Sequence, residues 1–294
     1  MRMKRLAQSI GETFIVQPLG VIPDTVSIDQ CGHAFGHHRP SDPARFAVGW
    51  NRYLLHLCAK FPQRFHRVPD FGINISEQLP SVAGADLIVL AVKPQQLRDL
   101  AIFLGSLLQK QLVVSIAAGI RSADLMRWMG GYGAVVRVMP NIPAQVQAGI
   151  SALYAATGVT SAQRQQAETL LSAVGSTLWL DDEAQMDAVT AISGSGPAYV
   201  FYFIEAMQQA ATELGLSAEH ARKLSMQTFL GASLLAMNSS ETPGALRIQV
   251  TSKGGTTEQA LLSMETATVK ASIICAIKAA AERSKQLGDM LGKD

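Results

Sequence analysis

The clearest pattern in the chain is an alternation of short apolar runs and amphipathic segments between residues 86 and 180. Residues 86–92, Asp-Leu-Ile-Val-Leu-Ala-Val, contain a continuous apolar run after the aspartate, and Lys93 and Pro94 end it. Such a run predicts a parallel strand that is covered on both faces. The same pattern predicts further strands at 112–116, 134–139, 150–155 and 177–180, and helices at about 95–108, 122–129 and 161–174. Strands alternating with helices predict an α/β domain with a doubly wound, Rossmann-like parallel sheet over residues 1–183.

Helices alone are predicted after this point, which indicates an all-helical domain over residues 184–294. The turn Ser193–Pro197 is expected to start a helix that ends at Gly215, because proline is tolerated in a first helical turn and glycine commonly follows a last one. Ser217 is a suitable N-cap for the next helix, which is expected to end near residue 237. Pro243 is expected to end a helix-like segment.

The last predicted helix is long and apolar on more than one face. Neither glycine nor proline occurs between Thr256 and Leu287, so we expect one continuous helix of about 30 residues. So much apolar surface in a small helical domain needs a partner. We therefore predict an obligate homodimer with interleaved helices.

The turn before this helix carries a chemical signal. Gly254 and Gly255 lie directly before the predicted helix, where backbone N–H groups lack acceptors and the helix dipole is positive. Glycines let the backbone approach a ligand closely, and the hydroxyls of Ser252, Thr256 and Thr257 add hydrogen-bond donors. The turn predicts a pocket for a small carboxylate or phosphate. An ordinary capped helix after a flexible turn is an equally open interpretation.

Composition and charge narrow the classes of function. The 294 residues suit one large or two ordinary domains, and the net charge of +2 comes without a basic cluster, so the charge gives no indication of nucleic-acid binding. Cys31, Cys58 and Cys275 are scattered and odd in number, which argues against a disulfide framework and for a reducing compartment. No run reaches the ~20 apolar residues of a membrane span, and no signal-peptide pattern opens the chain. We therefore predict a cytoplasmic protein that binds neither nucleic acid nor membrane.

Residues 1–70 do not follow this organisation. A dinucleotide-binding domain normally opens with an apolar strand and the motif G-x-G-x-x-G, which holds the pyrophosphate, and neither is present. A metal site at Cys31, His33, His37 and His38 would have a spacing that matches no usual zinc pattern, so we predict no metal. An irregular segment, or a shifted reading frame that recovers near Phe71, stays open, and we favour the shifted frame.

Five segments carry a resemblance to a known family from about residue 71 to the end of the chain. They are LIVLAVKPQ at 87–95, SIAAGI at 115–120, RVMPNIP at 137–143, DAVTAISGSGPAYVFYFIEAM at 187–207 and PGALRIQVTSKGGTTEQALLSME at 243–265. In this order they resemble the pyrroline-5-carboxylate reductases. The resemblance implies reduction of the C=N bond of 1-pyrroline-5-carboxylate to L-proline by hydride from NADPH or NADH, the final step of proline biosynthesis. It also implies a homodimer and leaves higher homo-oligomers open.

The resemblance assigns roles to individual residues. The turn would bind the substrate carboxylate through Ser252, Gly254, Gly255, Thr256 and Thr257. Thr257 is the candidate catalytic residue, because its hydroxyl would hydrogen-bond the ring nitrogen. A hydroxyl is a poor acid, so we expect it to position the ring more than to transfer a proton. The cofactor-binding residues that the resemblance implies are Ala91, Val92, Lys93, Pro94, Ile116, Ala117, Ala118, Asn141 and Glu183.

Two hypotheses on function are open at this point. In the first, the chain is an active reductase whose N-terminal residues supply another phosphate site. In the second, it is a non-catalytic or impaired relative, a dimeric helical scaffold whose cofactor site was lost with the glycine loop. A β-hydroxyacid dehydrogenase is a distant third, because the helical domain shows no catalytic lysine motif. Cofactor binding distinguishes the first two hypotheses.

Overall fold

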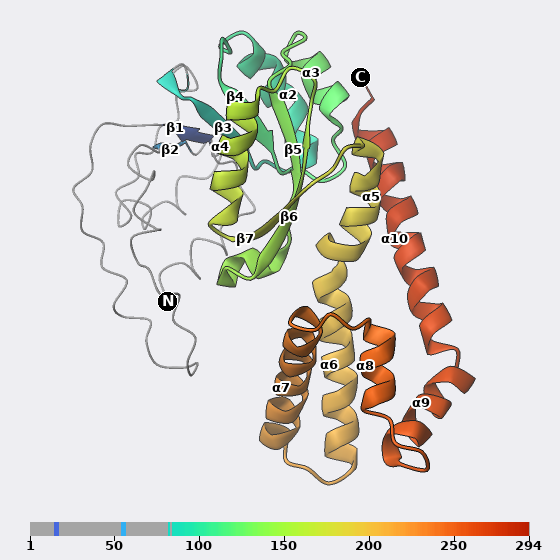
Figure 1. The fold of residues 1–294 in the computed structure, drawn as a ribbon. Helices are drawn as coiled ribbons and strands as arrows, with labels where there is room; N and C mark the ends of the chain where they lie inside the picture. The colour runs from blue at the N-terminus through green and yellow to red at the C-terminus, as the bar shows by residue number, and fades with distance from the viewer. Residues whose placement is uncertain (1–14, 18–53, 57–81, 83, 294) are drawn as a thin grey trace, which may run out of the picture. The chain divides into compact units, whose positions relative to one another are not determined.

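The computed structural model describes residues 15–17, 54–56, 82 and 84–293 (Figure 1). The predictions on Cys31, the neighbouring histidines and the shifted reading frame lie outside these residues. Within residues 1–70, β1 (Ile15–Gln17) pairs antiparallel with β2 (Leu54–His56). The chain divides into two compact units, which we call the sheet unit (Met1–Thr190 with Ser284–Asp294) and the helical unit (Ala191–Arg283). The domain boundary expected at residue 183 stays a prediction.

The sheet unit is built on five strands that follow one another in the sheet as they do in the sequence. They are β3 (Leu87–Leu90), β4 (Leu112–Ser115), β5 (Val135–Met139), β6 (Gly149–Ala155) and β7 (Gly175–Trp179). The first three run parallel to one another, and so do the last two. The carboxyl ends of β3, β4 and β5 therefore meet at one edge of the sheet.

One strand pair differs from the parallel sheet that the sequence predicts, since β6 runs antiparallel to β5. Residues 140–148 join the two strands and contain only the 3-10 helix η5 (Ile142–Val146). A parallel connection needs a crossover of a dozen or more residues, usually with a helix. The short link therefore returns the chain antiparallel, which the alternation of apolar segments does not reveal.

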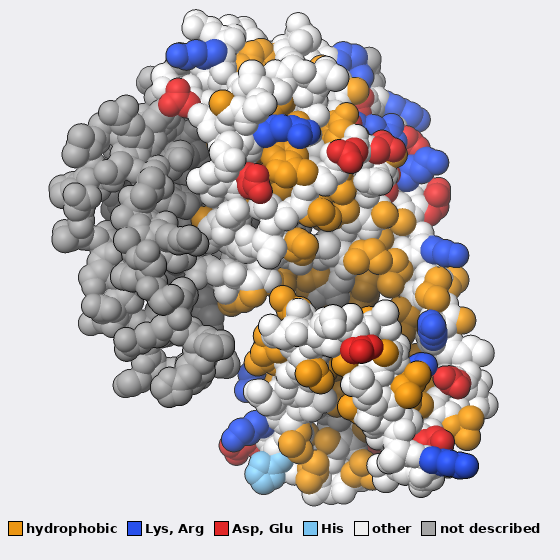
Figure 2. Space-filling model, viewed as in Figure 1, with side chains coloured by type: hydrophobic (Ala, Val, Ile, Leu, Met, Phe, Trp, Pro, Cys, Tyr) orange, Lys and Arg blue, Asp and Glu red, His pale blue; other side chains and the backbone are white. Residues whose placement is uncertain are grey.

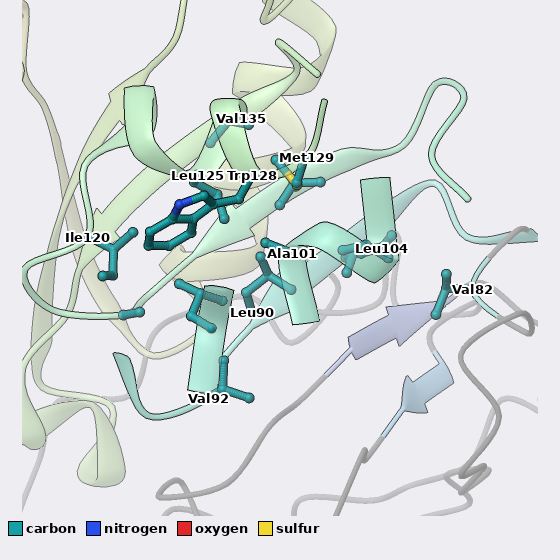
Figure 3. Packing of buried hydrophobic residues seen from close by; sticks show 14 of the residues in the cluster. Val82, Leu90, Val92, Ala101, Leu104, Ile120, Leu125, Trp128, Met129 and Val135 are labelled. Carbon is teal, nitrogen blue, oxygen red and sulfur yellow. The ribbon is translucent and has the colours of Figure 1, made fainter. Parts of the chain in front are cut away.

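Helices cover both faces of the sheet. α2 (Pro94–Gly105) and α3 (Ser122–Trp128) pack on one face and form a core with Leu90 and its neighbours (Figure 3). α4 (Ser161–Ser172) packs on the other face in a second core that includes Leu87. Successive residues of β3 alternate between these cores, because side chains along a strand point to opposite faces. The doubly wound α/β class is thereby confirmed.

The chain enters the helical unit through an almost continuous run of helix. η6 (Glu183–Gln185) and α5 (Met186–Val189) continue through the π-helical turn η7 (Thr190–Gly194) into α6 (Gly196–Glu213). Proline lies in the first turn of α6 as predicted, but the chain is already helical before the turn from which the sequence predicts this helix to start. The difference arises because the π-turn extends to Gly194 and Ser195 keeps a right-handed helical conformation as the N-cap of α6, so the chain stays close to a helical path through the Ser-Gly-Ser-Gly sequence.

Of the expectations for the next two helices, the start of one after Ser217 is confirmed and the helix end at Pro243 is wrong. α7 (Ala218–Met237) begins as predicted, with the Ser217 hydroxyl accepting a hydrogen bond from the His220 N–H at 3.2 Å. Pro243 does not end a helix. It begins α8 (Pro243–Gln249), at a position where a helix makes no use of the N–H that proline lacks.

The long final helix predicted from Thr256 is in fact two helices. α9 (Thr256–Thr266) and α10 (Val269–Leu291) meet at a bend of 53°. Thr268 at the break has a φ of 53°, a left-handed conformation that glycine usually fills. Because a threonine occupies this position, the sequence holds no signal for the break. No described helix is by itself long and apolar enough to cross a membrane. The bent pair of α9 and α10 reaches the required length and hydropathy only when the two helices are counted together.

The helical unit buries little of its own apolar surface. In these fully described helices, Ile204 is the only buried residue of α6, Ala221 and Ser225 are those of α7, and α8 and α9 have none. Phe201 is 59% exposed and Tyr202 73%. Figure 2 shows hydrophobic side chains across the visible surface of this unit.

Candidate active site

The first part of the candidate site lies where β3 ends, beside β4. The chain passes from Ala91 and Val92, which are 6% and 8% exposed, to the exposed Lys93 and then to Pro94 in the first turn of α2. Lys93 is the N-cap residue of α2, and its side chain makes no capping hydrogen bond. The start of α2 therefore combines a positive side chain with the positive end of a helix, which suits an anion. In doubly wound sheets, ligands bind at this edge.

The second part is the loop of residues 116–121 between β4 and α3, which we call the β4–α3 loop. The Ile116 N–H donates to the Leu90 carbonyl oxygen at 3.1 Å and so extends the bonding between β3 and β4. The Ala117 N–H lies 3.4 Å from its acceptor, the hydroxyl oxygen of Ser115. Ala117 is buried and Ala118 is exposed. Their small side chains allow a flat ligand to lie close to the backbone.

Asn141 follows β5 and lies at the same edge of the sheet. Its side-chain oxygen accepts a hydrogen bond from the Ile150 N–H at 3.0 Å. This bond joins the end of β5 to the start of β6, so it holds the short antiparallel link in shape. Asn141 therefore has a structural contact of its own, and its predicted contact with a nicotinamide stays a prediction.

Glu183 makes the densest polar contacts in this part of the molecule. Its Oε1 accepts hydrogen bonds from the Ser122 N–H at 2.7 Å and from Nη1 of Arg137 at 2.9 Å. Its Oε2 accepts a hydrogen bond from the Ser122 hydroxyl at 2.5 Å. The side chains of Arg137 and Glu183 are 8% and 19% exposed. Glu183 thus joins the start of α3, the middle of β5 and the chain that leads to the helical unit.

The other predicted residues lie in the helical unit, in the turn before α9. Gly254 has a φ of 71°, and its N–H donates to the Glu258 carboxylate at 2.7 Å. The Gly255 N–H donates to the Ser252 carbonyl oxygen at 3.1 Å, and a Cβ on Gly255 would lie 2.6 Å from the Ser252 hydroxyl oxygen. Both glycines therefore serve the shape of the turn, and their N–H groups are engaged within it.

The hydroxyls of Thr256 and Thr257 are left for a ligand at this turn. Both residues are exposed, and they occupy the first turn of α9, whose N-cap Gly255 provides no side-chain cap. N–H groups in a first helical turn have no acceptor within the helix. The turn can therefore bind a small anion through the hydroxyls and N–H groups of these two threonines.

The structure thus groups the predicted residues by unit. All those assigned to the cofactor belong to the sheet unit, and all those assigned to the substrate belong to the helical unit. Sequence reasoning missed Ser122, Arg137 and Glu258, which hold the predicted residues in place. Arg137 had a signal, because an arginine inside the apolar strand Val-Val-Arg-Val-Met needs a buried partner of opposite charge. Among the described residues, no group of His, Cys, Asp or Glu could hold a metal ion.

The end of α10 packs against the far end of the β4–α3 loop. Arg121 pairs with Asp289, and the hydrogen bond between them lowers the pKa of the Asp289 carboxyl below its usual value. The same bond raises the pKa of the Arg121 guanidinium. The Ser284 hydroxyl donates to the Asp187 carboxylate at 2.6 Å, which joins α10 to α5 within the sheet unit. The loop is thus in contact with a segment from the last turns of the chain.

Comparisons with known proteins agree with this architecture. Residues 183–287 match the family profile for pyrroline-5-carboxylate reductase dimerisation, and residues 59–119 match that for NADP oxidoreductase, coenzyme F420-dependent. The pyrroline-5-carboxylate reductase of Pseudomonas aeruginosa is 48% identical over 233 residues, which are 79% of this chain and 85% of that protein. That of Arabidopsis thaliana is 40% identical over 221 residues, which are 74% of this chain and 79% of that protein.

Solved structures give the same result. The structure of a pyrroline-5-carboxylate reductase from Coxiella burnetii is 38% identical, with a TM-score of 0.71 over 76% of this chain and 84% of that chain. The structure of a Plasmodium falciparum pyrroline carboxylate reductase with NADP bound is 32% identical, with a TM-score of 0.69 over 74% of this chain and 82% of that chain. The chain therefore belongs to the pyrroline-5-carboxylate reductase family.

Proposed function

We propose that the chain reduces the C=N bond of 1-pyrroline-5-carboxylate to L-proline with hydride from NADPH or NADH, as the final step of proline biosynthesis. The observation that carries the proposal is the turn Ser252–Thr257, in which exposed hydroxyls surround the start of a helix in a chain of this family. A small ring that bears one carboxylate and one imine fits such a turn. The relative from Pseudomonas aeruginosa is named for this substrate.

In this proposal the turn binds the substrate carboxylate. Thr256 and Thr257 supply N–H groups and hydroxyls, Ser252 adds a hydroxyl, and Gly254 and Gly255 give the turn its shape. Thr257 also hydrogen-bonds the ring nitrogen. Its main effect is to hold the C=N bond in the orientation that hydride transfer needs, because a hydroxyl is a weak acid.

The cofactor site is proposed at the carboxyl edge of β3, β4 and β5. Ala91, Val92 and Pro94 form one wall and residues 116–118 form the next, while Lys93 approaches a ribose or phosphate and Asn141 the nicotinamide. Two features of the structure fit a dinucleotide here, namely the small side chains along the β4–α3 loop and the N-cap of α2 without a side-chain bond. The cofactor supplies the hydride.

The proposal is tested by measuring oxidation of NADPH in the presence of 1-pyrroline-5-carboxylate, at 340 nm. We expect turnover by the wild type and a fall of roughly 10- to 100-fold in kcat/KM for Thr257→Val. Thr266→Val changes a threonine at the other end of α9 and is the control, with an expected effect below about twofold. A wild type that binds NADPH without turning over would support the impaired-relative hypothesis, and equal loss in both variants would remove Thr257 from the site.

We further propose a homodimer, located in the cytoplasm, that binds neither nucleic acid nor membrane. The dimer is supported by the helical unit, whose apolar side chains are mostly exposed in a single chain. Leu230→Asp and Leu234→Asp place charges one helical turn apart on α7, and we expect them to yield monomers in sedimentation velocity. Gln166→Asp on α4 adds the same charge to the sheet unit and should leave the dimer intact. A wild type that sediments as a monomer would refute the proposal.

A further inference from the structure

The β4–α3 loop is fastened at both of its ends. At the β4 end, the hydrogen bond from the Ile116 N–H to Leu90 holds the backbone in the sheet. At the α3 end, Ser122 donates both its N–H and its hydroxyl to Glu183, at 2.7 and 2.5 Å. A segment of six residues that is held at both ends in this way can adopt few conformations. The position of Ala117 and Ala118 therefore depends on Glu183, although Glu183 is remote from them in the sequence.

Glu183 is itself held in place. Its bond to Arg137, at 2.9 Å, attaches the carboxylate to the centre of β5, and Ser122 is 6% exposed. Arg137 lies opposite Ser115 of β4 in the sheet, so the arginine comes from the strand next to the one that the loop leaves. The anchor is thus built on the rigid part of the fold.

From this geometry we propose that Glu183 is a positioning residue for the dinucleotide. It sets the path of residues 116–121 through Ser122, and Arg137 supplies the opposite charge that keeps Glu183 in this position. Its effect on the cofactor is therefore transmitted through the loop backbone. This inference rests on the proposed dinucleotide site at the edge of the sheet.

The test compares Glu183→Ala with Ser122→Ala and with the control Glu168→Ala. Glu168 is also in the sheet unit, where it accepts hydrogen bonds from Thr177 and Trp179, away from the loop. The dissociation constant of NADPH is measured by fluorescence titration without substrate. We expect an increase of about tenfold or more for Glu183→Ala and about threefold for Ser122→Ala, which keeps its N–H bond, and no change for Glu168→Ala.

Two further measurements separate positioning from a loss of stability. KM for 1-pyrroline-5-carboxylate should stay within about twofold of the wild type in each variant, because the substrate turn lies in the other unit. Amide hydrogen exchange in a peptide spanning residues 116–122 should become faster in Glu183→Ala and stay unchanged in Glu168→Ala. If Glu183→Ala fails to fold, Ser122→Ala carries the same comparison.

The inference is overturned if folded Glu183→Ala binds NADPH as tightly as the wild type, or if exchange in the loop does not change. A wild type that binds NADPH but does not reduce 1-pyrroline-5-carboxylate would refute the proposed reaction alone, because the titration needs no substrate. A wild type that binds neither NADPH nor NADH would overturn the dinucleotide site together with the positioning role.

Discussion

Arg137 and Glu183 should behave in unfolding experiments as one buried unit. Arg137 Nη1 lies 2.9 Å from Glu183 Oε1, and the two side chains are 8% and 19% exposed. The perturbation is a double-mutant cycle that replaces Arg137 by methionine and Glu183 by glutamine, singly and together. Methionine keeps the length of the arginine stem without its charge, and glutamine keeps the shape of the glutamate with one acceptor.

The expected magnitudes follow from the burial of the pair. Two unit charges about 3 Å apart attract by roughly 5 to 6 kcal/mol at an effective dielectric constant of about 20, before desolvation is subtracted. Removing one partner of a buried pair typically costs about 3 to 5 kcal/mol, because the other charge is left alone. We expect about 3 kcal/mol for R137M and about 2 kcal/mol for E183Q, since glutamine still accepts a hydrogen bond.

The double variant should lose about 3 kcal/mol, not the sum of about 5, because no buried charge is left unpaired. The coupling free energy of the pair is then about 2 kcal/mol. Urea unfolding followed by circular dichroism measures all four proteins, at one fixed protomer concentration because a dimer makes apparent stability depend on concentration. Equal slopes against urea show that the four proteins unfold between comparable states.

A surface pair provides the control. Arg247 and Glu265 lie 3.8 Å apart with side chains 49% and 66% exposed, so R247M and E265Q should couple by less than about 1 kcal/mol. If the losses for Arg137 and Glu183 add to within about 0.5 kcal/mol, the two side chains are energetically independent and our account of the buried unit is wrong.

Three further predictions concern stability. Thr268→Gly should raise the free energy of unfolding by about 1 kcal/mol, because Thr268 has a φ of 53° that glycine adopts without strain; a loss of stability in urea unfolding would refute this. Leu97→Ala should lower it by about 2 to 4 kcal/mol in the same assay, because Leu97 is fully buried against the sheet. Arg121 lowers the pKa of the Asp289 carboxyl in the folded protein. The pair therefore stabilises the fold above about pH 4, and this contribution is lost as the pH falls through the pKa that Asp289 has in the folded protein. In unfolding curves at lower pH, the stability of Asp289→Asn should therefore approach that of the wild type.

The fold was predictable where a local pattern decides the structure. The continuous apolar runs of β3 and β4 identified buried parallel strands, and Ser217 identified the start of α7, because both signals depend on neighbouring residues. The antiparallel direction of β6 and the bend at Thr268 were not predictable in this way. The first depends on the length of a connection and the second on one backbone angle, which the sequence reports only when glycine is present.

The candidate site also has a part that local sequence patterns predict and a part that they do not. The small residues at the strand ends and the turn at Gly254 could be found from motifs. The contacts that hold them could not, because Glu183 bonds Ser122 and Arg137 across separations of 61 and 46 residues. An arginine inside an apolar strand indicates that a buried partner of opposite charge exists, but it does not indicate which residue that partner is. Identification needs the tertiary structure.

The two units differ in the source of their stability, and this difference bears on where the substrate turn can function. The sheet unit buries two cores of its own, one on each face of the sheet. The helical unit, as described, has no comparable core, and side chains such as Tyr202 remain largely exposed in a single chain.

Because burial of apolar surface supplies most of the stabilisation of a fold, the helices need apolar contacts from outside the chain, and a second copy offers the same faces. The hydrogen bonds that shape the turn at Gly254 and Gly255 are local, but α8 and α9 on its two sides contain no buried residue in the single chain, so we expect assembly to hold these helices and the turn in place. We therefore expect the proposed substrate binding at this turn to require assembly, whereas the proposed cofactor edge belongs to a unit that buries two cores within the single chain.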